Sequence, residues 1–225
     1  PQGYDIAINN KGLREVPKPR MFLSKEEMIM GRQIINQVKE RLQKEKTVII
    51  QPFGRGVQHV DNSFIDNTGR SIEYKDFKAL IKKLQEQDFA VISMAEMGFD
   101  FSKDKLPFDV AMPEQVSLRH WTAAIKFANH FIGCDSVGQH LAYIMDTPST
   151  VICGPTFPVN ISYPECEYFN IVDLGMKDRV YDPIRIMPDE TTSRHNENLM
   201  QMNDDIVDYV VDRVLGKPIP EDDNE

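Results

Sequence analysis

Cysteine is scarce in this 225-residue sequence, and long apolar runs are missing from it. The three cysteines, Cys134, Cys153 and Cys166, form neither a CxxC pair nor a spacing typical of metal sites. We therefore expect buried, reduced thiols rather than disulfides or a metal centre. No apolar stretch approaches the roughly 20 residues that span a bilayer, and the first residues do not resemble a signal peptide. These absences predict a cytoplasmic protein without a transmembrane segment.

Positive charge is scarce as well. Asp and Glu number 35 against 26 Lys and Arg, which gives a net charge of -9, and the cations are scattered among acids. Because DNA and RNA are gripped by clustered Lys and Arg, we expect no nucleic-acid partner. A small phosphorylated ligand is compatible with this charge, since amides at a helix N-terminus can bind it locally. No GxGxxG follows a first strand and opens a helix, which disfavours a Rossmann dehydrogenase.

The composition, 41% hydrophobic and 27% charged, is that of an ordinary globular domain. Residues 1–22 are polar and punctuated by glycine and proline, so we interpret them as a linker or an extended arm. Residues 23–216 are expected to form one domain, and 217–225 an acidic, disordered tail. Because the sequence begins with Pro1 rather than Met, we expect a processed chain or a fragment of a longer one.

Strand and helix patterns alternate along the domain. Ser24 and Glu27 form a capping box that opens a helix, which we expect to end near Lys44. Several strands are continuous apolar runs, typical of a parallel sheet covered by helices on both faces. The predicted fold class is therefore α/β, a doubly wound, Rossmann-like parallel sheet. The expected strands are 47–51, 89–94, 109–112, 130–134, 149–153 and 168–174, and 52–72 is expected to be a long loop. Four further helices are expected: one that contains Leu80, one that begins at Ser117, one that spans 136–145 and one that contains Val210.

Ligands of doubly wound sheets bind beyond the carboxyl ends of the strands, so the residues after each strand are candidates for a site. Gly54 and Arg55 follow the first strand and could bring backbone and guanidinium close to an anion, or form a plain turn. Glu96 follows the second and could accept hydrogen bonds from ribose hydroxyls, or be a solvated acid. Thr156 belongs to a stiff GPTFP segment at 154–158 that suits a pocket wall or a chain reversal.

The segment after the 130–134 strand is the most informative. Asp135 or Ser136 can cap the next helix. The amides of Ser136, Val137 and Gly138 would then form an anion site, with Gly138 leaving room for a phosphate. His140 lies one turn further and could add a donor. The alternative is an ordinary capped helix with a core histidine.

Together these segments are more specific than any one of them. GCDSVGQHLA at 133–142, a short apolar strand and GPTFP at 154–158 resemble the heptosyltransferase family, glycosyltransferase family 9. Ser117 and Leu118, which open a helix upstream, and the leading LSKEE at 23–27 also match. The resemblance covers 19–164. It implies that 23–216 is the nucleotide-sugar-binding, C-terminal half of a two-domain GT-B glycosyltransferase.

The resemblance also implies a function. The family transfers a sugar, often a heptose, from a nucleotide diphosphate donor (here an ADP-sugar) to a hydroxyl of a saccharide acceptor, with no metal and no cofactor. It implies that Ser136, Val137 and Gly138 hold the diphosphate beside His140. It further implies that Arg55 approaches the phosphates or sugar and that Glu96 lies near the ribose. The full set expected to bind the donor is Gly54, Arg55, Glu96, Ser117, Leu118, Asp135, Ser136, Val137, Gly138, His140 and Thr156.

Two positions depart from the family pattern. The family has glycine directly after the Asp-Ser or Asp-Thr pair, where this chain has Val137 followed by Gly138. The family also often has a lysine shortly after the first-strand loop, where this loop runs through His59 and Arg70. We expect amide dipoles to stabilise charge on the leaving diphosphate. The general base would come from an N-terminal acceptor domain that this chain lacks, so we assign no catalytic residue.

Two other classes of function remain as alternatives. The first is a nucleotide-binding or interaction module of a larger assembly, without transfer activity; it would bind the donor without hydrolysing it, even with a partner half supplied. The second is a sugar-nucleotide epimerase, which needs several carboxylates in its pocket. Only Glu96 and Asp135 stand at strand ends, which disfavours the epimerase.

Overall fold

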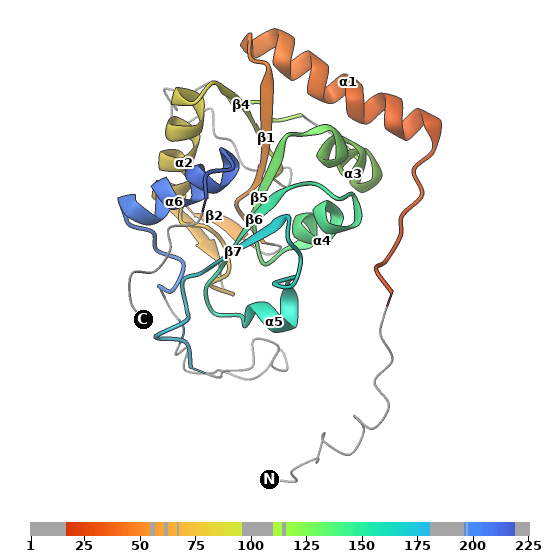
Figure 1. Ribbon diagram of the computed structural model, residues 1–225. Coiled ribbons are helices and arrows are strands. Elements are labelled where there is room, and N and C mark those ends of the chain that lie inside the picture. Colours follow the sequence, from red (N-terminus) through yellow and green to blue (C-terminus); the bar gives the residue numbers. More distant parts are fainter. Residues whose placement is uncertain are drawn as a thin grey trace.

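The computed structural model describes residues 17–54, 57–60, 63–66, 68–95, 110–113, 116–180, 196 and 198–218. Its centre is a five-stranded, all-parallel sheet in the order β4-β1-β5-β6-β7 (Figure 1). The doubly wound α/β class predicted from the sequence is confirmed. The strands are β1 (Lys46–Gln51), β4 (Phe89–Ser93), β5 (His130–Cys134), β6 (Ser149–Cys153) and β7 (Phe169–Asp173).

Helices cover both faces of this sheet. On one face lie α1 (Lys25–Leu42), α3 (Leu118–Phe127) and α4 (Val137–Ile144), and on the other α2 (Tyr74–Glu86) and α6 (Asp204–Val214) (Figure 1). Neighbouring residues of one strand enter opposite layers. Val48 and Ile50 of β1 pack under α2 and α6, whereas Ile49 packs under α1 and α3. Burial on both faces explains why the strands read as unbroken apolar runs.

The helix caps predicted at Ser24 and Ser117 are confirmed. The Ser24 hydroxyl accepts the N–H of Glu27 at 3.1 Å, and the Glu27 carboxylate accepts that of Ser24 at 2.6 Å. The Ser117 hydroxyl accepts the N–H of His120 and begins α3. Helix α1 ends at Leu42, two residues earlier than expected, because Gln43 adopts the left-handed conformation.

Two stretches differ from the prediction. The expected loop at 52–72 contains an antiparallel hairpin, β2 (Val57–Val60) and β3 (Ser63–Asp66). Phe64 of β3 stacks on Phe53 with ring centroids 5.1 Å apart, so tertiary packing rather than local pattern orders this hairpin. The expected strand at 109–112 is reduced, in its described part, to one bridge between Ala111 and Ile92. A short helix, α5 (Pro158–Ile161), was not expected.

Several expectations lie outside the described residues. They concern most of the arm (1–16), Arg55, Glu96 and the end of the tail (219–225). In the part that is described, no helix has the length and apolarity needed to cross a membrane.

Helices α1 and α3 meet at a glycine. A Cβ atom on Gly31 would stand 2.4 Å from the Cβ of Ala123 and 2.5 Å from its carbonyl carbon. The two backbones therefore approach so closely that only hydrogen fits between them. The contact fixes α1 on α3, and an ion pair between Glu27 and Arg119 joins the same two helices near their first turns.

We expect Gly31→Ala to destabilise the protein although alanine is the better helix former. The propensity gain is about 1 kcal/mol, whereas overpacking against backbone costs about 1 to 3 kcal/mol and is not relieved by a side-chain rotation. Urea unfolding should give a lower free energy of unfolding than the wild type. The matched control is Asn36→Ala on the exposed face of α1, which should be neutral or slightly stabilising; equal behaviour of the two variants would contradict the close contact.

Candidate functional site

The N-terminus of α4 lies at the carboxyl edge of the sheet, beside the end of β1. Gln51, the last residue of β1, is buried, and its side chain lies against this helix start. The Gln51 Oε1 accepts the N–H of Gly138 at 2.7 Å, and its Nε2 donates to the Ser136 hydroxyl at 3.0 Å. Ser136 occupies the cap position, but its side chain makes no capping bond. Gln51 therefore caps α4 from another strand, which no local sequence pattern indicates.

The contact with Gln51 gives a packing reason for the glycine at position 138. A Cβ atom there would lie 2.4 Å from both Gln51 Oε1 and Phe131 Cζ. The glycine is needed for packing against these two side chains, and its amide is already paired, so it does not keep space open for a phosphate as expected. Within the described part of the chain, the amides of Ser136 and Val137 make no hydrogen bond. Those two amides are the donors that an anion could use.

A cation lies at the same strand end. Arg70 Nη1 is 3.3 Å from Asp135 Oδ2, and the Asp135 side chain is only 10% exposed. The other carboxylate oxygen, Oδ1, accepts from Gln139 Nε2 of α4 at 3.5 Å. Asp135 therefore links the 66–71 turn to α4, which is a structural role. Among the described residues of the loop after β1, Arg70 brings positive charge to this edge.

A single carboxylate orders the turn that carries Arg70. Asp66 accepts the N–H and hydroxyl of Thr68 at 2.7 and 2.6 Å, and the N–H and hydroxyl of Ser71 at 2.9 and 2.6 Å. It also accepts the Arg70 N–H at 3.1 Å. Partial burial of Asp66 opposes its charge, but the hydrogen bonds from Ser71 and Thr68 prevail and lower the pKa below its ordinary value. The Ser71 hydroxyl also receives the Gly54 N–H at 3.0 Å, which joins the turn to the end of β1.

His140 lies one turn into α4, half-buried. Its Nδ1 is 2.8 Å from the Tyr163 hydroxyl, and the two rings meet edge to face. Burial lowers the pKa of His140, and the nearby charge of Asp135 opposes that shift only in part. The imidazole is therefore neutral at physiological pH.

The loop after β6 is held by a buried cation. Arg179 donates to the Gly154 carbonyl at 2.7 Å, pairs with Asp173 at the end of β7, and lies over the Phe157 ring at 4.8 Å. Thr156, in the middle of this loop, is buried, and its hydroxyl has no hydrogen-bond partner among the described residues. Arg179 therefore holds this loop in place, and whether the loop forms a pocket wall stays a prediction. Neither Arg179 nor Asp173 was indicated by the sequence.

Of the remaining sequence candidates, the structure describes Ser117 and Leu118, which lie at the start of α3. Ser117 uses its hydroxyl as the cap of α3, and Leu118 is exposed at the first turn of the same helix. Arg55 and Glu96 fall outside the described residues. Among the residues that are described, no three His, Cys, Asp or Glu side chains are grouped as a metal site.

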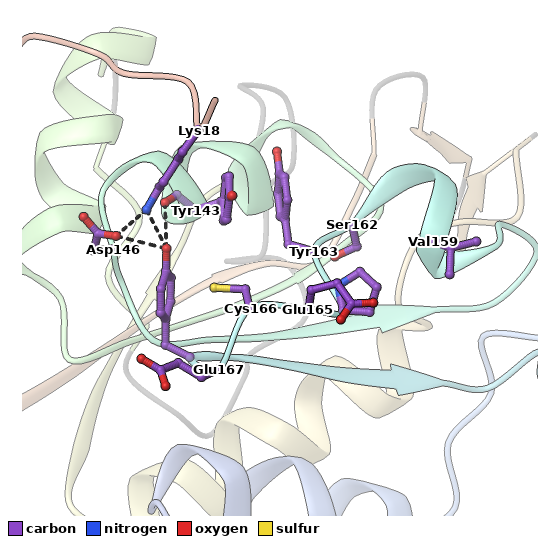
Figure 2. Close-up of a pocket in the computed structure, with 11 residues that line it drawn as sticks. Lys18, Tyr143, Asp146, Val159, Ser162, Tyr163, Glu165, Cys166 and Glu167 are labelled. Carbon is purple, nitrogen blue, oxygen red and sulfur yellow. Dashed lines mark hydrogen bonds and ion pairs between the residues drawn. The ribbon is translucent and has the colours of Figure 1, made fainter. Parts of the chain in front are cut away.

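A cavity of about 640 Å³ opens beside α4 (Figure 2). Its walls come from the arm before α1, the end of α4 and the segment between α5 and β7. Lys18 of the arm pairs with Asp146 and donates to the Tyr168 hydroxyl at 2.6 Å. Tyr143 and Tyr163 stack in the same wall with ring centroids 3.5 Å apart. This aromatic wall went unnoticed in the sequence because its tyrosines are distant from one another along the chain.

Solved structures share this architecture at low sequence identity. Heptosyltransferase II of E. coli has a TM-score of 0.54 and 10% identity, over 89% of this chain and 56% of its own. A family 9 glycosyl transferase of Veillonella parvula has a TM-score of 0.61 and 9% identity, over 88% and 54%. The E. coli heptosyltransferase WaaC, in a structure with ADP, has a TM-score of 0.50 and 15% identity, over 82% and 48%. No protein-family model and no curated protein matches the sequence.

These matches define the class of the fold. The chain spans about half the length of the three solved chains and has the Rossmann-like α/β architecture of that part of them. The heptosyltransferase-like resemblance is thereby confirmed for the fold.

We expect Asp66→Asn to destabilise the protein by about 2 kcal/mol, because an amide nitrogen cannot accept the hydrogen bonds that the charged oxygen receives. The pKa of Asp66 is lowered in the folded protein, so its contribution is complete at neutral pH. It is lost as the pH falls from the ordinary value of about 4 towards the folded pKa.

Urea unfolding of both proteins between neutral and acidic pH measures this difference. The difference in the free energy of unfolding between wild type and variant should become smaller below about pH 4, where the carboxyl of the unfolded chain is protonated. The exposed Asp178→Asn serves as the matched control and should leave stability unchanged throughout. A gap for Asp66→Asn that is the same at every pH would contradict the role of the charge.

Proposed function

We propose that this chain binds the diphosphate of a nucleotide sugar at the N-terminus of α4 and serves as the donor-binding half of a heptosyltransferase-like glycosyltransferase. The observation that carries the proposal is the arrangement at the end of β5. Two unpaired amides, at Ser136 and Val137, share this edge with the Arg70 guanidinium that Asp135 holds. A helix N-terminus with a nearby guanidinium suits a phosphate. The similarity to WaaC, whose structure includes ADP, supports an ADP-sugar as the donor.

In this proposal, transfer depends on stabilising the leaving group. When the glycosidic bond breaks, negative charge grows on the diphosphate, and donors that are already oriented stabilise it without reorganisation. The amides of Ser136 and Val137 are such donors because Gln51 and the helix hold them in place. Arg70 takes the position for which the family pattern uses a lysine. Metal would not be needed if these donors carry the charge.

The acceptor and the base belong to a second domain. The segments after β5, β6 and β7 each carry an exposed apolar side chain: Val137 (39% exposed), Val159 (74%) and Met176 (73%). Exposed apolar residues gathered along one edge are typical of a surface that a partner covers. We infer that an N-terminal acceptor domain covers this edge, binds the saccharide acceptor and provides the general base.

We expect ADP or another nucleoside diphosphate to raise the melting temperature of this chain, and the matching monophosphate to do so less. Ligand at about 100 times its Kd stabilises the native state by roughly 2.7 kcal/mol. Thermal unfolding with ADP, UDP, GDP and their monophosphates would also identify the base. Absence of any shift from a folded chain would contradict the proposal.

Two variants locate the binding site. Gln51→Glu retains an oxygen that caps α4 but adds a negative charge beside the diphosphate. Since like charges 4 Å apart interact by about 4 kcal/mol at an effective dielectric of 20, it should weaken diphosphate binding at least about 10-fold. Arg70→Met should weaken it by removing the cation. Arg32→Met, at an exposed position of α1, is the matched control and should bind as the wild type does. Equal affinity of all four proteins would place the nucleotide elsewhere.

A further inference from the structure

Tyr163 connects the candidate donor site to the aromatic wall of the adjacent cavity. It lies after α5, and its hydroxyl reaches His140 Nδ1 at 2.8 Å across the gap between two segments. Among the residues that the structure describes, Tyr163 is the one that hydrogen-bonds the imidazole of His140. A ring nitrogen held in this way decides which tautomer the histidine adopts and how its ring is oriented.

The Tyr163 ring is firmly held. It stacks on Tyr143 with centroids 3.5 Å apart and planes 7° from parallel, and it meets Phe169 of β7 edge to face at 5.5 Å. Lys18 lies with its ammonium 4.7 Å from the centroid of Tyr143, and Figure 2 shows Tyr143 between Lys18 and Tyr163. Stacking and edge contacts of this kind restrict ring orientation. The hydroxyl that reaches His140 is therefore fixed in space by a packed cluster.

Chemistry decides the direction of this hydrogen bond. Burial raises the pKa of Tyr163, so its hydroxyl stays protonated, and burial lowers the pKa of His140, so its ring stays neutral. Of the two neutral partners, the imidazole nitrogen is the far stronger base and the phenol the stronger acid. The phenol therefore donates to Nδ1, which leaves the ring hydrogen on Nε2. The charged group that acts on this histidine from a neighbouring segment is Asp135, at the end of β5.

We propose that Tyr163 is a positioning residue that holds His140 in the tautomer with hydrogen on Nε2, so that a neutral imidazole offers one oriented N–H to the diphosphate. This inference rests on the proposed donor site and deepens it. A neutral donor of this kind adds a hydrogen bond without placing a permanent cation in the site.

The first test needs no nucleotide. Long-range nitrogen–proton NMR of the free protein reports which ring nitrogen of each histidine carries hydrogen, and a His140→Gln variant assigns the signal. In the wild type we expect hydrogen on Nε2 alone. In Tyr163→Phe, which keeps the ring and its stacking, we expect exchange between the two tautomers. Hydrogen on Nδ1 in the wild type, or identical ring shifts in both proteins, would overturn the proposal.

The second test measures nucleoside diphosphate affinity by calorimetry at pH 8 and at an acidic pH at which NMR shows the His140 ring to be protonated. Freeing one side chain costs binding about 3- to 10-fold, so Tyr163→Phe should bind that much more weakly at pH 8. The loss should shrink at the acidic pH, because imidazolium carries hydrogen on both nitrogens whatever orients it. A loss that is equal at both pH values would mean a merely structural role and would overturn the proposal.

Tyr143→Phe is the matched control, because it removes a hydroxyl from the same stack without touching His140, and it should bind as the wild type does at both pH values. The two proposals fail in different ways. No nucleotide binding by the wild type contradicts the donor site, whereas an unchanged tautomer in Tyr163→Phe contradicts the positioning role alone.

Discussion

Parallel pairing in a sheet buried on both faces is the constraint on which the rest of this molecule depends. Because all five strands run in one direction, the segments that follow them leave from a single edge. Polar groups cannot be placed inside the two apolar layers without partners, so they collect at that edge. Gln51, Asp135 and Asp173 all stand at or just beyond the ends of strands. The same geometry that buries the core thus gathers, among the described residues, polar groups that could hold a polar ligand at this edge.

At this edge three segments are each held by a polar residue from a different strand or turn. Gln51 from β1 caps the helix that follows β5, Asp135 after β5 holds Arg70 from the turn after β3, and Arg179 after β7 holds the loop after β6. Each contact crosses between segments that are far apart in the sequence. Such a network has few alternative arrangements, which is the condition for donors that are oriented before a ligand arrives.

Much of the fold could be predicted because its signals are local. The capping box at Ser24, the cap at Ser117 and the apolar runs of the strands depend on residues a few positions apart, and the structure confirms them. The fold class also predicted a candidate site at the start of α4, and ligand binding there stays a prediction. The hairpin at 57–66 could not be predicted, because Phe53 and Tyr74, which pack on its Phe64, lie outside the hairpin itself. From the sequence Gln51 is only the end of a strand, because its role as a cap depends on Ser136 and the helix that begins there, 85 residues further along the chain.

An acidic chain that binds a diphosphate is not a contradiction. At physiological ionic strength charges more than about 8 Å apart are largely screened, so the net charge of -9 matters less to a bound anion than the groups that touch it. The Asp135 carboxylate offsets part of the positive charge of Arg70. The pair therefore offers a bound anion a guanidinium in a fixed orientation, with little net charge. Neutral amides and a neutral imidazole add direction without adding charge. We therefore expect the proposed site to recognise the shape of a diphosphate more than its charge, unlike the clustered cations that bind nucleic acid.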